Sequence, residues 1–358
     1  MALTIIVPAA TQAATPQVRG QWAAAMGDSS LRRFYSAGGD MGEIVNRVVS
    51  YQTANRVWQL RQGRPGAPTP SDMRSRTDSW AAQNDSLIPI ADSMERPLFA
   101  RVMVRLAGRE EEGLIRSQSD RLDLGLLYAP SSGSYLGIGL AAEESSSDVL
   151  YADGRARGQT FGPRFDAGLV INPTWSAGVR FDYLMYKGDS EVNVQTAGGR
   201  LNIARDAQYT RQYLQAGLMA RYTKAQLSWL PEGSVLRWSN SLQMIQNHHE
   251  PAINSIGQPT TEPFGRTEHL SLVRTGLNYT QNVSQDGLWS AFGEVAFDYE
   301  FDTNMAFPIN DRAGMVFSAA IVRQIARGKR VQLLVDRFQH TKDDRSRNSI
   351  TLIGVIDF

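Results

Sequence analysis

The chain has 358 residues, with 37 Lys and Arg against 36 Asp and Glu, so its net charge is +1. So small a net charge excludes the strong positive field of a nucleic-acid-binding protein, and we expect no nucleic-acid partner. The absence of cysteine excludes disulfides and thiolate metal sites. No run of 18 apolar residues occurs, which excludes a membrane-spanning helix.

Residues 1–14 form the first distinct segment. They are apolar and end in small residues around Ala13, but they lack a basic start. This pattern is typical of the core and cleavage site of a secretory signal, so we interpret the segment as a truncated signal-like sequence. The alternative is a disordered apolar tail.

Residues 15–95 form a second segment, which we expect to be helix and linker. Asp40 and Glu43 have the spacing of a capping box, and the sequence predicts a helix over 41–62 that ends at Gly63. At 1.5 Å per residue this helix spans roughly 33 Å, about the thickness of a bilayer core. Residues 64–92 are rich in Pro, Ser and Asp and predict a linker.

Two interpretations of this helix remain open. It is either a plug in a pore or an ordinary amphipathic helix of a small periplasmic domain. In a pore, Arg47, Arg56 and Arg61 would meet Asp298 or Glu300 on the wall. The residues assigned to the plug are Ile44, Arg47, Arg56 and Arg61.

Residues 96–358 are almost all strand and loop. Twelve segments alternate apolar and polar residues, as in Trp175 to Tyr183. Connections after odd strands are long and polar, such as 142–160 and 187–209, whereas those after even strands are mostly short. A transmembrane barrel sorts its loops in this way. The sequence therefore predicts an all-β fold, a 12-stranded antiparallel transmembrane β-barrel with an N-terminal helix and linker, and both barrel ends in the periplasm.

The alternation also predicts which side chains face the lumen. Aromatic residues lie on the apolar faces, many near strand ends, as in the girdles of membrane barrels. The apolar faces would then meet lipid and the polar faces would line a wet lumen, whereas a soluble barrel would reverse the two. The predicted lumen-lining residues are Arg101, Arg105, Asp123, Arg164, Asp166, Arg180, Asp182, Arg221, Arg274, Glu294, Asp298 and Glu300.

The last ten residues alternate and stop on an aromatic side chain. They resemble the closing strand of a bacterial outer-membrane barrel, which in that class is the signal read by the assembly machinery. The residues assigned to this assembly signal are Ile350, Leu352, Ile356 and Phe358.

The stretches 134–140 and 165–183 have glycine-spaced strands and a tight turn at Asn172-Pro173. With twelve strands after a helix and linker, the chain resembles the translocator (β) domain of bacterial autotransporters over its C-terminal three-quarters. The resemblance implies a translocator or anchor pore for the N-terminal segment or for a partner. Only about 80 residues precede the predicted barrel, which departs from the family by lacking a large passenger domain.

Two other functions stay open from the sequence. One is a passive solute channel, or porin, gated by the N-terminal helix. A more distant one is a lipid hydrolase at the barrel rim that uses His269 and Ser271. We expect no cofactor and no metal, because His248 and His249 are neighbours that would point to opposite faces of a strand. The expected location is the bacterial outer membrane, with outer-membrane lipid, lipopolysaccharide, the barrel assembly machinery and a secreted or periplasmic protein as partners.

Overall fold

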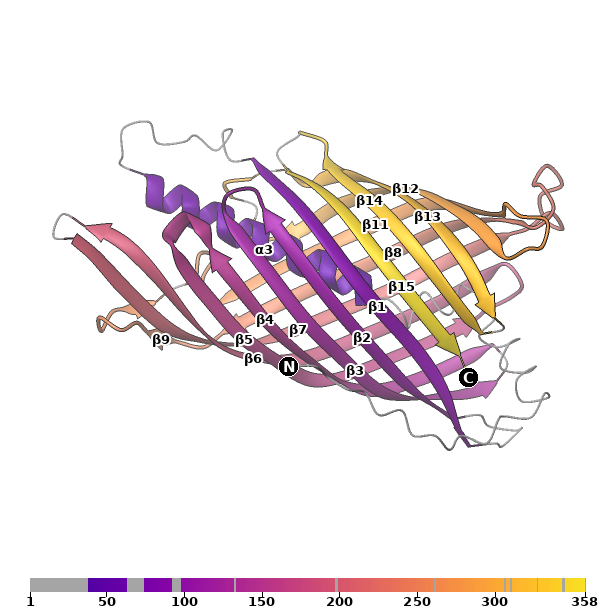
Figure 1. Cartoon of the computed structure of the whole chain (residues 1–358), viewed down its shortest axis with the longest axis horizontal. Helices are drawn as coiled ribbons and strands as arrows, with labels where there is room; N and C mark the ends of the chain where they lie inside the picture. The colour runs from indigo at the N-terminus through magenta and orange to yellow at the C-terminus, as the bar shows by residue number, and fades with distance from the viewer. Residues whose placement is uncertain are drawn as a thin grey trace.

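Thirteen strands close into a barrel around one long helix within the part of the chain that the computed structural model describes (Figure 1). That part comprises residues 38–62, 74–91, 98–131, 133–196, 199–260, 262–305, 307–309, 311–326, 328–342 and 345–357. The signal-like segment 1–14 and Phe358 lie outside it. No helix in these ranges is long and apolar enough to cross a membrane.

The elements follow in chain order. The helix α3 (Gly38–Arg61) precedes the strands, and η2 (Leu150–Ala152) is a single 3₁₀ turn. Strands β9 (Ala252–Ile253) and β10 (Pro259–Thr260) pair only with each other. The barrel strands are β1 (Ser75–Ala91), β2 (Leu98–Glu111), β3 (Ile115–Ser131), β4 (Ser134–Val149), β5 (Gly154–Val170), β6 (Trp175–Thr196), β7 (Gly199–Tyr222), β8 (Ser234–His249), β11 (Thr267–Asn282), β12 (Trp289–Thr303), β13 (Ala313–Ala326), β14 (Lys329–His340) and β15 (Arg345–Asp357).

The predicted count of twelve strands is wrong by one, because β1 enters the wall. It pairs antiparallel with β2 and parallel with β15, so the barrel is mixed rather than wholly antiparallel. Residues 75–91 had been assigned to the linker, and the barrel therefore begins near residue 75 instead of 96. Without β1, strands β2 and β15 would be antiparallel neighbours, since Asn84 aligns with both Val104 and Gly354.

Strand β1 was not predicted because the middle of its outward face is polar. Trp80 and Ile90 are exposed toward its two ends, but Asn84 and Ser86 face outward at the level of Val102 and Val104, and the Asn84 amide donates to the Ser86 hydroxyl at 3.0 Å. Alternation between apolar and polar residues is the signal of a strand between lipid and water. Polar residues in the middle of the outward face interrupt that signal.

The two ends of the barrel differ. We call the end where β15 begins the loop end, and the end where β15 finishes the turn end. The sequence predicts that the first strand starts and the last strand finishes at the same end of the barrel. This is wrong, because β1 begins at the loop end, opposite Arg345, and β15 finishes at the turn end. The polar stretches 142–160 and 187–209 are mostly strand, and β6 and β7 pair without a break from Trp175–Ala220 to Thr196–Gly199. Polar residues there alternate with the same period, so strand continues past the apolar region.

The outward face carries the apolar side chains. Leu124 is 48% exposed and Ile138 is 55% exposed, whereas inward Asp123 is 3% exposed. The same exposed apolar series runs along β2, β3, β4, β12 and β14. This is the arrangement of a barrel with lipid outside, because a charge facing lipid at the bilayer midplane costs roughly 2–4 kcal/mol.

Candidate functional site: a helix in the lumen

Helix α3 lies inside the barrel, since it contacts strands from several sides of the wall. Near its start, the Met41 sulfur accepts from Arg121 of β3 and Arg180 of β6. Near its end, Trp58 packs edge-on against Phe307 in the β12–β13 connection, with 4.7 Å between ring centroids. The helix therefore runs from within the barrel to the loop end, as Figure 1 shows.

One face of α3 is apolar and packed. Its side chains recur every three or four residues, as on one side of a helix, and all are at most 2% exposed. They meet a wall of apolar residues from β6, β7, β8, β11 and the connection after β12. On the helix the packed residues are Met41, Ile44, Val48, Tyr51, Ala54 and Val57; on the wall they include Leu184, Tyr213, Ile245, Leu270, Leu272, Met305 and Ile309.

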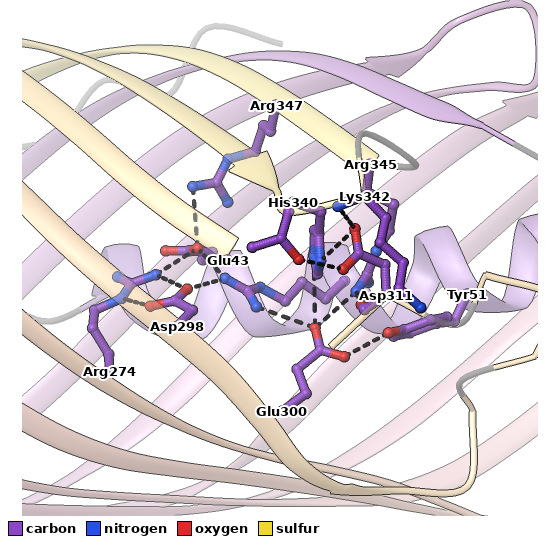
Figure 2. Close-up of polar contacts among 12 residues, drawn as sticks. Glu43, Tyr51, Arg274, Asp298, Glu300, Asp311, His340, Lys342, Arg345 and Arg347 are labelled. Carbon is purple, nitrogen blue, oxygen red and sulfur yellow. Dashed lines mark hydrogen bonds and ion pairs between the residues drawn. The ribbon is translucent and has the colours of Figure 1, made fainter. Parts of the chain in front are cut away.

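A charge network fixes the same helix to β11, β12 and β15 (Figure 2). Arg47 forms ion pairs with Asp298 and with Glu300, the latter at 3.1 Å. Its guanidinium also lies 4.3 Å from the centre of the Phe338 ring. Arg47 is 5% exposed and the two carboxylates are fully buried, so the pairs are shielded from solvent.

Each carboxylate in this network has more than one partner. Arg274 contacts Asp298 at 2.6 Å and Glu43 at 2.7 Å, and Arg347 contacts Glu43 at 3.3 Å. Glu300 accepts from Arg345 at 3.0 Å and from the Tyr51 hydroxyl at 2.5 Å. A hydrogen bond to a charged group contributes about 1.5–3 kcal/mol, and the contacts of Arg47 and Glu43 add several such bonds between the helix and the wall. The network therefore holds α3 in one register.

A second set of contacts holds the end of the helix at the loop end. Arg56 and Arg205 each contact Glu262 at 2.6 Å, and the Gln52 amide donates to Glu268 at 2.6 Å. Burial would raise the pKa of Glu262, but the positive charges of Arg56, Arg205 and His249 outweigh it and lower that pKa below its usual range. Glu262 is thus held as a carboxylate.

The opposite face of α3 borders an open space. A cavity of about 640 Å³ lies between this face, which presents Gly42, Val45, Asn46 and Val49, and the wall. It reaches from Ser117 and Ser147 near the loop end to Val355 near the turn end. The helix consequently narrows the lumen without filling it.

The predicted lumen-lining positions all have inward parity in the strands. Eight of them are at most 8% exposed, and Arg105, Arg221, Arg274 and Glu294 are half-buried. The structure joins most of them into ion pairs, which are Arg101–Asp166, Arg121–Asp123, Arg164–Asp123, Arg164–Asp166, Arg180–Asp182 and Arg274–Asp298. Arg164 aligns with Asp182 across the β5–β6 hairpin, but Arg164 pairs with Asp166 and Asp123, and Asp182 pairs with Arg180.

The predicted plug residues have separate positions. Ile44 is fully buried and Arg47 reaches Asp298 and Glu300. Arg56 reaches Glu262 instead of those two, and Arg61 lies exposed in the last turn. The helix begins three residues earlier than predicted, at Gly38. On β15, Ile350 and Leu352 are exposed outward, and Ile356 shares their parity.

The sequence analysis missed several residues of the network. Glu43 was assigned only to a helix cap, and Arg345 and Arg347 were placed in or beside a predicted loop. Both arginines have the inward parity of Thr351 and Ile353 farther along β15. Extending that parity backwards from the C-terminal strand was the signal that could have located them.

The rim-hydrolase alternative gains no catalytic geometry. His269 pairs with Asp302 at 3.2 Å, Ser271 is 2% exposed, and no hydrogen bond joins Ser271 to His269 within the described residues. His249 contacts Glu268 at 2.9 Å. In the same part of the chain, no group of three or more His, Asp or Glu side chains is arranged to hold a metal ion.

No protein-family model and no curated protein sequence matches this chain. Among solved structures it is similar to the translocator domain of the autotransporter NalP from Neisseria meningitidis, with 10% identity, a TM-score of 0.49, and coverage of 64% of this chain and 77% of that one. It is also similar to the β domain of the Bordetella autotransporter BrkA, with 13% identity, a TM-score of 0.48, and coverage of 73% and 96%.

A third similar structure is the Pseudomonas putida toluene transporter TodX, with 9% identity, a TM-score of 0.39, and coverage of 68% of this chain and 76% of that one. These similarities concern the barrel architecture alone. The chain is structurally similar to autotransporter translocator domains at that level, and the closed β-barrel itself is given by the strand pairing.

Proposed function

We propose that this protein is a passive channel for small polar solutes in the bacterial outer membrane, and that α3 is the gate that narrows it. One observation carries the proposal: α3 packs against one side of the lumen and leaves a cavity of about 640 Å³ against the other. A static plug would be expected to fill its lumen, as cores are close-packed.

The wall of the cavity suits water and polar solutes. Its lining includes Ser79, Ser119, Ser145, Ser241 and Thr160, together with charged side chains on several strands. Hydroxyl groups both donate and accept hydrogen bonds, so they can replace part of the water shell of a passing solute. The exposed apolar side chains on the outside support a wall that lies in lipid.

The gate would open when the charge network releases α3. Arg47 has buried partners on β12, and both partners keep other arginines when Arg47 leaves: Arg274 for Asp298 and Arg345 for Glu300. The two carboxylates of the wall therefore keep positively charged partners when the helix is undocked, which lowers the free-energy cost of opening. We propose outer-membrane lipid, lipopolysaccharide and the barrel assembly machinery as partners, with the C-terminal strand as the assembly signal.

A translocator or anchor role is the second candidate, favoured by the presence of α3 in the lumen. The direction in which α3 runs along the barrel is relevant to this second candidate. The first turns of α3 lie inside the lumen, and the helix ends at the loop end, where β1 begins. An N-terminal passenger held beyond the loop end would need the opposite direction. A secreted or periplasmic partner belongs to this second candidate.

Single-channel recording tests the channel. The full chain and a variant that lacks residues 15–63 are refolded in detergent, checked for a gel shift on boiling, and inserted into planar bilayers. The deletion should raise the conductance several-fold, because an α-helix about 10–12 Å across leaves the lumen. Equal conductance in two folded proteins, or none in either, would contradict the proposal.

A further inference from the structure

We infer that the cavity beside α3 is a binding site for small oxyanions, such as phosphate, sulfate or the carboxylate of a small solute, and that it makes the channel anion-selective. The inference rests on the proposed channel and adds the chemical class of the solute. It follows from the charge, the spare donors and the hydroxyl groups of the cavity wall.

The cavity has an excess of positive charge. Its lining contains eight arginines and five carboxylates, and rings of arginine or lysine favour anions in pores. The arginines are Arg105, Arg109, Arg121, Arg211, Arg237, Arg274, Arg330 and Arg347; the carboxylates are Glu43, Asp85, Glu143, Glu294 and Asp336.

Three of the five carboxylates are engaged by arginines. Glu43 is shared by Arg47, Arg274 and Arg347, with distances of 2.7–3.3 Å. Asp85 and Glu143 each lie 3.5 Å from an arginine nitrogen of the wall. These carboxylates are therefore poor competitors for a cation that enters the cavity.

Arginine donors remain in the same wall. Arg211 is 7% exposed, and its guanidinium donates to two neutral oxygens, Asn247 Oδ1 at 3.0 Å and the Tyr209 hydroxyl at 2.9 Å. No carboxylate of the described residues lies within 4 Å of it. The Nε of Arg109 and one Nη of Arg121 are buried without a hydrogen-bond partner. Charge-assisted bonds to an oxyanion are the strongest that such donors form.

Hydroxyl groups complete the site, and the helix leaves room for it. Ser117 and Ser147 lie on adjacent strands of the cavity wall, with their oxygens 2.9 Å apart. On the helix, a Cβ at Gly42 would come within 2.5 Å of Arg105 Nη1. The absence of a side chain there lets the Arg105 guanidinium approach the first turns of α3, where the helix dipole is positive.

Two substitutions test the site, and neither leaves a carboxylate without a positively charged partner. Arg211→Gln removes a cation whose partners are neutral, and Arg347→Gln leaves Glu43 with Arg47 and Arg274. The matched control is Arg116→Gln with Arg155→Gln, because both arginines are more than half exposed outside the cavity. Each pair is combined as a double variant of the full chain.

In a KCl gradient across a planar bilayer, the full chain should pass Cl⁻ in preference to K⁺, and the cavity double variant should shift the reversal potential toward zero. Calorimetric titration with sodium sulfate in detergent should show binding that weakens about tenfold or more in the cavity variant and stays unchanged in the control. Conductance with cation preference, or sulfate binding equal in both double variants, would overturn the inference and leave the channel intact. A closed pore with the expected sulfate binding would overturn the channel and leave the site.

Discussion

The two sides of the lumen have different roles: one binds the helix and the other borders the cavity. The side formed by β11, β12 and the loop-end connections is acidic and apolar, and it binds Arg47 and Arg56 of the helix. The serines and arginines on the rest of the wall border the cavity, although Arg109, Arg121 and Arg347 also contact the helix. Cavity arginines with neutral partners, such as Arg211, stay available to solutes. Because α3 docks on one side of the lumen, a passage remains beside it.

The largest effect that tests this difference is expected at the charge network. Arg47→Met should weaken docking of α3 by about 3–6 kcal/mol, because it removes two buried contacts, to Asp298 and Glu300, each worth about 1.5–3 kcal/mol. Hydrogen exchange of the helix amides measures the docking. Arg56→Met is the matched control: its side chain is 36% exposed, so about 0–1 kcal/mol is expected. Equal losses in the two variants would mean that the acidic wall does not decide where the helix lies.

The packed face of the helix provides the next test. Ile44→Ala removes a fully buried side chain and should cost about 2–4 kcal/mol of docking free energy. Val45→Ala lies one residue farther along, on the cavity side, and should cost less than half as much. The same exchange measurement compares them. A larger loss at Val45 would place the packed face on the other side of the lumen.

Strand β1 tests whether the open side is a true membrane wall. Asn84→Leu replaces a polar side chain on the outward face of β1 and should stabilise the barrel by about 1 kcal/mol in lipid. Ala82→Leu, two residues away on the same face, is the control for added apolar size. Unfolding by urea in lipid vesicles gives the difference. Destabilisation by Asn84→Leu beyond that of the control would mean that this face does not meet lipid.

The smallest effect concerns pH at the end of the helix. The positive charges around Glu262 lower its pKa in the folded state, so its contribution is complete above the usual glutamate pKa and is lost as pH falls through the lowered value. Docking of residues 52–61 should be constant from pH 8 to 5 and weaken below about pH 4. Exchange at these amides measures it, and Glu262→Gln should abolish the dependence. A transition near neutral pH would contradict the assignment of the effect to Glu262.

Much of this architecture could be predicted from alternation alone. Arg180 and Asp182 are inward because their neighbours Val179 and Phe181 are apolar and outward, and the start of the helix could be predicted to within three residues. Strand β1 could not, since its outward face is polar in the middle, at Asn84 and Ser86. The partner of Arg56 could not either, because Glu262 lies in a connection without periodicity. The position of the cavity depends on which side of the lumen the helix contacts. These contacts are between residues far apart in the chain, so local sequence patterns do not predict them.

Two adjacent residues of α3 test the central claim directly. The chain has no cysteine, so Val48→Cys and Val49→Cys each introduce a unique thiol. Val48 is 1% exposed in the packed face, and Val49 lines the cavity. A charged, membrane-impermeant thiol reagent should modify the cysteine at 49 rapidly and block conductance, while the cysteine at 48 stays protected. Equal protection of both, or modification at 49 without block, would contradict a passage between the helix and the open wall.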